Sequence, residues 1–156
     1  MKREFETALI ARRAEIRARW QEMLFVEPVT SPLAHPRTLS FLLDQTLDRV
    51  FVELRRGGRG GAATRPECAC GRNPFLAYFR AGNQALLEAL VLVLAATPGL
   101  DAAERDAAFA DLQSAIDRIA SEEIATFGSL CKHRESVTPA DADHGPGAIC
   151  SAHQAQ

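Results

Sequence analysis

Residues 73–99 read NPFLAYFRAGNQALLEALVLVLAATPG, and this stretch decides the fold class. It opens with Asn73, whose side chain can cap a helix, and Pro74, which suits the first helical position. The large apolar residues that follow recur at the spacing of a helical face. They are Phe75, Leu76, Phe79, Leu86, Leu87, Leu90, Val91 and Leu94. Thr97, Pro98 and Gly99 end the pattern, so the stretch predicts the most deeply buried helix of the protein.

Three further segments have the same helical period. The first runs from Met1 to about Leu24, the second from Arg37 to Arg56, and the last from Ala102 to about His133. Asp101 and Glu104 form a capping box in front of the last helix, which is expected to be longer than its partners or to bend at Gly128. The residues expected to face the core are Phe5, Leu9, Ile16, Trp20 and Leu24 in the first helix; Leu39, Leu43, Leu47, Val50 and Leu54, widened by Phe41, Leu42 and Phe51, in the second; and Phe109, Leu112, Ile116, Ile119, Ala120, Ile124 and Phe127 in the last.

These four helices predict an all-α fold, either an antiparallel four-helix bundle or a globin-like helical domain. The broad apolar face of the second helix suggests that it packs against two neighbours. Residues 1–135 form the expected domain. Residues 136–156 have no period and much Pro, Gly, Ala and Asp, so they are expected to be a disordered tail.

Composition limits the partners and the compartment. The chain has 156 residues, of which 47% are apolar and 24% charged, and its net charge of −2 gives no general case for nucleic acid. Residues 55–72 contain five arginines and one acidic residue, whereas residues 101–130 contain seven acidic residues. We therefore expect a basic loop to lie near an acidic helix. No apolar run is long enough for a signal peptide or a membrane span, which predicts a cytoplasmic protein.

Several chemistries lack their motifs. The chain contains no Glu-x-x-His pair for a di-iron site, no HExxH, no phosphate-binding GxxxxGK[ST] and no GxSxG. No ionisable residue stands clearly on an apolar stripe where a general base would sit. The sequence therefore favours a protein that is not an enzyme.

The stretch PECACG, residues 66–71, supplies the one candidate site. Cys68 and Cys70 could combine with Cys131 and with either His133 or His35 to bind zinc, because thiolate and imidazole are the ligands that Zn²⁺ prefers. In an up-down-up-down bundle these pairs would lie at the same end. Two alternatives remain open: redox-active thiols activated by nearby arginines, or cysteines without a cofactor.

A resemblance adds a functional expectation. Trp20 near the end of a first helix is followed by the proline-containing segment SPLAHPRTLSFLLDQTLDRVFVEL, residues 31–54. Over about residues 5–55 the chain resembles the N-terminal sensory domain of stressosome RsbRD-type proteins and of some bacterial sensor histidine kinases. The resemblance implies a helical input module without enzymatic activity, acting in signal transduction. We therefore expect a sensor or interaction domain, a regulatory protein partner and a homodimer.

Overall fold

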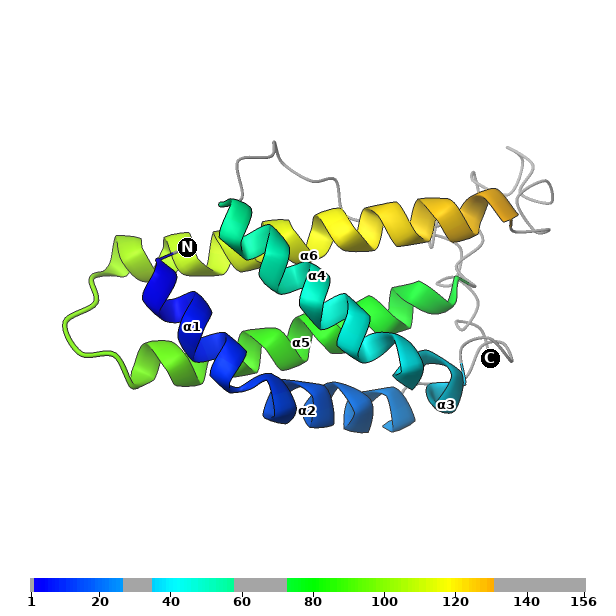
Figure 1. The fold of residues 1–156 in the computed structure, drawn as a ribbon, viewed down its shortest axis with the longest axis horizontal. Helices are drawn as coiled ribbons and strands as arrows, with labels where there is room; N and C mark the ends of the chain where they lie inside the picture. The colour runs from blue at the N-terminus through cyan, green and yellow to red at the C-terminus, as the bar shows by residue number, and fades with distance from the viewer. Residues whose placement is uncertain (1, 27–34, 58–72, 131–156) are drawn as a thin grey trace, which may run out of the picture.

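The computed structural model describes residues 2–26, 35–57 and 73–130, and Figure 1 shows their arrangement. All elements in these ranges are helical, which confirms the predicted all-α class. The elements are α1 (Arg3–Ala11), α2 (Arg13–Val26), α3 (Pro36–Leu39), the 3₁₀ turn η2 (Ser40–Leu42), α4 (Leu43–Arg56), α5 (Pro74–Ala95) and α6 (Ala102–Leu130). No helix among the described residues is long and apolar enough to cross a membrane.

The first two predicted helices are each interrupted. The first is broken at Arg12, where ψ is 10° and the backbone N–H donates to Leu9 O at 3.0 Å, one residue short of the α-helical partner. The second begins with α3, whose N-cap is His35, and passes through η2 before α4 starts. The first expected helix is therefore divided into α1 and α2, and the second into α3, η2 and α4.

The last two predicted helices form as expected. Asn73 caps α5 by accepting a hydrogen bond from Phe75 N–H at 3.0 Å, and Pro74 occupies the first turn. The Asp101 carboxylate accepts from Glu104 N–H at 2.7 Å, while Glu104 accepts from Asp101 N–H at 3.3 Å, which completes the predicted capping box. The α6 helix continues through Gly128 and extends roughly 43 Å.

The helices pack so that α4 and α5 each contact α1, α2 and α6. Ion pairs fix their directions: Arg55 near the end of α4 meets Glu6 in α1, and Arg49 meets Glu122 in α6, so α4 is antiparallel to both. Lys2 pairs with Glu104, which places the beginnings of α1 and α6 at one end of the molecule.

The up-down-up-down order considered from the sequence is wrong. The α5 helix begins at the opposite end from the end of α4, because the Asn73 amide donates to Ile124 O, far along α6, at 3.1 Å. Helices α4 and α5 therefore run in the same direction (Figure 1). At about 3.3 Å per residue, residues 58–72 are enough to connect their two ends.

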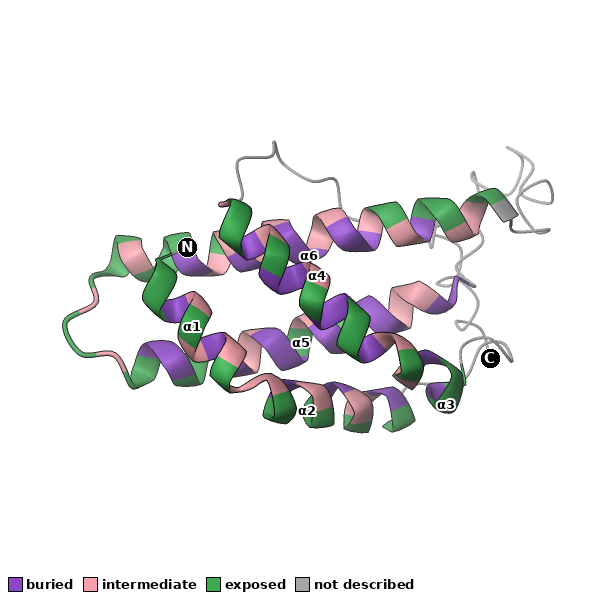
Figure 2. Ribbon diagram, in the orientation of Figure 1, coloured by how far each residue is buried: buried purple, intermediate pink, exposed green. Residues whose placement is uncertain are grey.

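The core contains the predicted apolar stripes with two exceptions (Figure 2). Phe41 is 87% exposed, because it lies in the 3₁₀ turn, where three residues per turn take the side chain off the α-helical stripe. Val91 is 51% exposed on the side of α5 that faces solvent. The residues expected inside but only half-buried are Leu42, Phe75, Leu76, Leu87, Phe109 and Phe127.

Candidate functional site

The predicted metal or redox residues Cys68, Cys70, Cys131 and His133 lie outside the described residues. His35 is described: its Nδ1 accepts a hydrogen bond from Arg37 N–H at 3.2 Å, so one ring nitrogen serves as a helix cap. Within 2–26, 35–57 and 73–130 no group of three or more His, Cys, Asp or Glu residues could hold a metal ion.

Two described residues near the cysteines in the sequence, Asn73 and Ile124, nevertheless lie close together. Asn73 is buried at 3% exposure and bridges two helices, because its Oδ1 caps α5 while its Nδ2 donates to Ile124 O in α6. Cys70 precedes Asn73 by three residues, and Cys131 follows Ile124 by seven. Helix α5 therefore begins beside the last part of α6, although the up-down-up-down order from which this proximity was predicted is wrong.

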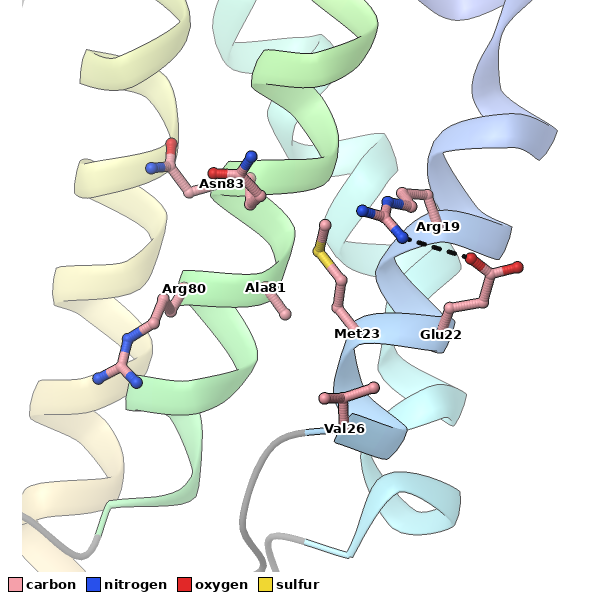
Figure 3. A pocket seen from close by; sticks show the side chains of 8 residues that line it. Arg19, Glu22, Met23, Val26, Arg80, Ala81 and Asn83 are labelled. Atoms are coloured by element: carbon pink, nitrogen blue, oxygen red, sulfur yellow. Dashed lines mark ion pairs between the residues drawn. The ribbon is translucent and has the colours of Figure 1, made fainter.

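A hollow with a mixed polar and apolar lining lies between α2 and α5 and has a volume of about 720 Å³ (Figure 3). Ala81 has the smallest of its side chains, and the helices α2 and α5 supply four residues each. The lining residues are Arg19, Glu22, Met23, Val26, Arg80, Ala81, Asn83 and Gln84. Val26 is 86% exposed, so the apolar part of this hollow is open to solvent.

An ion-pair network borders the hollow. The Arg19 guanidinium donates to Glu88 at 2.8 and 3.3 Å, and Gln84 Nε2 donates to the same carboxylate at 3.0 Å. These hydrogen bonds, with that from Arg19 first, lower the pKa of Glu88, and the Glu88 carboxylate in turn raises the pKa of Arg19. Arg19 also lies 3.6 Å from Glu22 (Figure 3). The polar border of the hollow is therefore anchored by charges of both signs.

Asn83 differs from the other polar residues of the hollow. Its Oδ1 is buried without a hydrogen-bond partner among the described residues. Buried carbonyl oxygens are usually paired, because an unpaired one loses its hydration without compensation.

Below the hollow lies the polar centre of the core. The Trp20 indole N–H donates to Tyr78 O at 2.9 Å, and the Tyr78 hydroxyl donates to Thr46 Oγ1 at 2.9 Å. Burial raises the pKa of Tyr78 above its usual range. Because Trp20 and Tyr78 are 1% and 0% exposed, these groups hold α2, α4 and α5 together and do not face a ligand. The prediction that Trp20 faces the core is confirmed.

Gly82 allows this arrangement. A Cβ atom at this position would lie 2.2 to 2.6 Å from three atoms of the Trp20 ring, far inside van der Waals contact. The sequence analysis missed this contact, although a glycine inside an otherwise regular helix is a recognised sign of close approach.

Ion pairs between helices join charges that lie far apart in the sequence. Arg13 and Arg17 pair with Asp44, and Arg13 also with Asp48, so their partners lie on α4 and not on the acidic α6. The acids of α6 pair instead with Arg49, through Glu122 and Glu123. The expected basic loop lies mostly outside the described residues. Sequence reasoning could find each charge but not its partner, because exposed pairs depend on how neighbouring helices are aligned.

The geometry thus defines an all-helical domain with a tightly bonded interior and a solvent-facing hollow on α2 and α5. Comparison of the chain with protein-family models, with curated proteins and with solved structures found no match.

Proposed function

We propose that the protein is a non-enzymatic sensor or interaction domain of a bacterial regulatory system. It acts in the cytoplasm as an all-helical domain, with a bundle or globin-like packing in which α4 and α5 run in the same direction, and it transmits a signal to a regulatory protein partner. The sensor assignment draws on the resemblance of residues 5–55 to RsbRD-type sensory domains. The structural support comes from the hollow between α2 and α5.

The observation that carries the proposal is the contrast between this hollow and the interior. Inside, Trp20, Tyr78, Thr46 and Asn73 use their polar groups to bond one helix to another. At the hollow, Val26 is largely exposed beside Arg19 and Arg80. Apolar side chains bordered by charges of both signs are typical of protein docking surfaces.

A comparison of two matched variants tests the proposal. Met23→Glu puts a charge into the hollow, whereas Val52→Glu makes the same kind of change at a 41% exposed site on α4. We expect a partner protein, identified by mass spectrometry and then purified, to bind the wild type and Val52→Glu but not Met23→Glu. Turnover of a defined small substrate that a single polar substitution abolishes would contradict the proposal.

A second candidate function is metal binding, with zinc or another thiolate-bound metal, or redox sensing through Cys68 and Cys70. The observation that favours it is the hydrogen bond from the Asn73 amide to Ile124 O, because Cys70 precedes Asn73 by three residues in the chain and Cys131 follows Ile124 by seven. A closed set of Cys68, Cys70, Cys131 and His133 would be a structural site.

Elemental analysis decides this second candidate. Protein purified without chelator should contain about one metal ion per chain, and the Cys68→Ser/Cys70→Ser variant none. Removing the metal should also lower the melting temperature, because binding energy at a structural site is part of the folding energy. Metal-free wild-type protein whose melting temperature does not respond to Zn²⁺ would exclude the metal site and leave redox chemistry or simple packing for the cysteines.

A further inference from the structure

The side of α5 that faces solvent carries exposed apolar side chains beside charged ones. Because α5 contacts α1, α2 and α6, its remaining side is turned to solvent. Val91 and Leu92 on this side are 51% and 53% exposed. We define the α5 outer face as Ala77, Arg80, Gln84, Glu88, Val91 and Leu92.

The charges and sizes of this face are self-complementary about Gln84. Arg80 lies four residues before Gln84 and Glu88 four residues after it, while the small Ala77 lies seven before and the larger Val91 seven after. In a two-fold dimer the same patch meets itself, so residue i contacts residue j and j contacts i. With the axis beside Gln84 and the two α5 helices antiparallel, each Arg80 meets a Glu88 and each Ala77 meets a Val91.

The hollow between α2 and α5 fits the same arrangement. Leu92 lies eight residues after Gln84, so Leu92 of the second copy comes level with residue 76, near the start of α5. Val26 and Met23 line the hollow at that end of α5 (Figure 3). Two exposed apolar groups, Leu92 and Val26, would then cover each other twice in one dimer.

We propose that the occupant of the α5 outer face is a second copy of this chain, forming an antiparallel two-fold dimer. This inference rests on the proposed function, because it identifies a second copy of the chain as a partner at the surface where the proposed function places a protein interaction. The contact between the two copies does not require an unpaired charge. The Glu88 carboxylate already accepts hydrogen bonds from Arg19 and Gln84, and Arg80 of the second copy adds a further cation beside the same carboxylate.

A charge-reversal experiment tests the dimer. The full chain is studied by sedimentation equilibrium over a range of concentrations, as wild type, Arg80→Glu and Glu88→Arg. Each single variant places like charges opposite each other at both symmetric contacts, so its dimer dissociation constant should rise about tenfold or more. An equimolar mixture of the two variants should restore association as a heterodimer, which a folding defect in either variant could not produce.

Arg37→Glu is the matched control, because it makes the same change at an exposed position on α3 and should leave the dissociation constant unchanged. A wild type that stays monomeric at every concentration overturns the inference. So does an Arg80→Glu variant that dimerises like the wild type, or a mixture that fails to recover. A monomeric wild type leaves the proposed function open, since binding of a different protein to Met23→Glu and Val52→Glu is measured separately.

Discussion

Replacing Gly82 with alanine tests the packing at the centre of the fold. The added methyl group would lie 2.2, 2.4 and 2.6 Å from three atoms of the Trp20 ring. Trp20 has little room to move, since it is 1% exposed, its ring centroid lies 4.8 Å from that of Tyr78, and its N–H is bonded to Tyr78 O. The substitution must therefore shift either the indole or the whole of α5.

The expected change in the free energy of unfolding is the sum of opposing effects. Replacing glycine with alanine inside a helix stabilises the folded protein by about 1 kcal/mol. Overpacking a core costs about 1–3 kcal/mol, and breaking the buried indole hydrogen bond costs about 1 kcal/mol more. We expect Gly82→Ala to lower the free energy of unfolding by about 2–3 kcal/mol in total, since both costs apply here at their upper range.

Urea denaturation followed by fluorescence measures this change, because Trp20 is the sole tryptophan of the chain. Gly128→Ala is the matched control: nothing lies within 4 Å of the Cβ that would be added there, so this variant should be as stable as the wild type or up to about 1 kcal/mol more stable. Trp20→Phe, followed by circular dichroism, should remove most of the penalty of Gly82→Ala. A Gly82→Ala protein as stable as the wild type would refute the reasoning.

Three further predictions use the same denaturation assay. Tyr78→Phe should cost about 1–3 kcal/mol, because it leaves the buried Thr46 hydroxyl without its donor, and adding Thr46→Val should recover part of that loss; no recovery would show that the hydroxyl finds another partner. Asn73→Ala should cost about 2 kcal/mol, against about 1 kcal/mol for Asp101→Ala, because only Asn73 both caps a helix and bonds to a second one; equal costs would contradict this account. Hydrogen bonds from Arg17 and then Arg13 lower the pKa of Asp44 in the folded state, so its stabilising effect should be fully present above the unfolded carboxyl pKa of about 4 and should be lost as the pH falls through the lower folded value. Asp44→Asn should reduce this loss of stability at low pH. If the stability of the variant depends on pH as the wild type does, ionisation of Asp44 is not coupled to folding.

The sequence by itself determined the helical class and most of the interior. Apolar spacing identified part of the buried face of each long helix, including Leu86 and Leu90 in α5 and Leu112 in α6, because a helix that packs along its whole length must present the same face every three to four residues. The helix caps at Asn73 and at Asp101 with Glu104 could also be predicted from the sequence, because a capping side chain acts within three residues of its own position.

Tertiary structure decided what depends on residues far apart in the chain. The parallel course of α4 and α5 follows from which helix ends meet, a choice that apolar period alone does not encode. The contact between Gly82 and Trp20, and the partners of Arg13 and Arg49, arise only when two helices are aligned against each other. The hollow has the same origin, because its lining combines residues from the last two turns of α2 with Arg80 to Gln84 of α5.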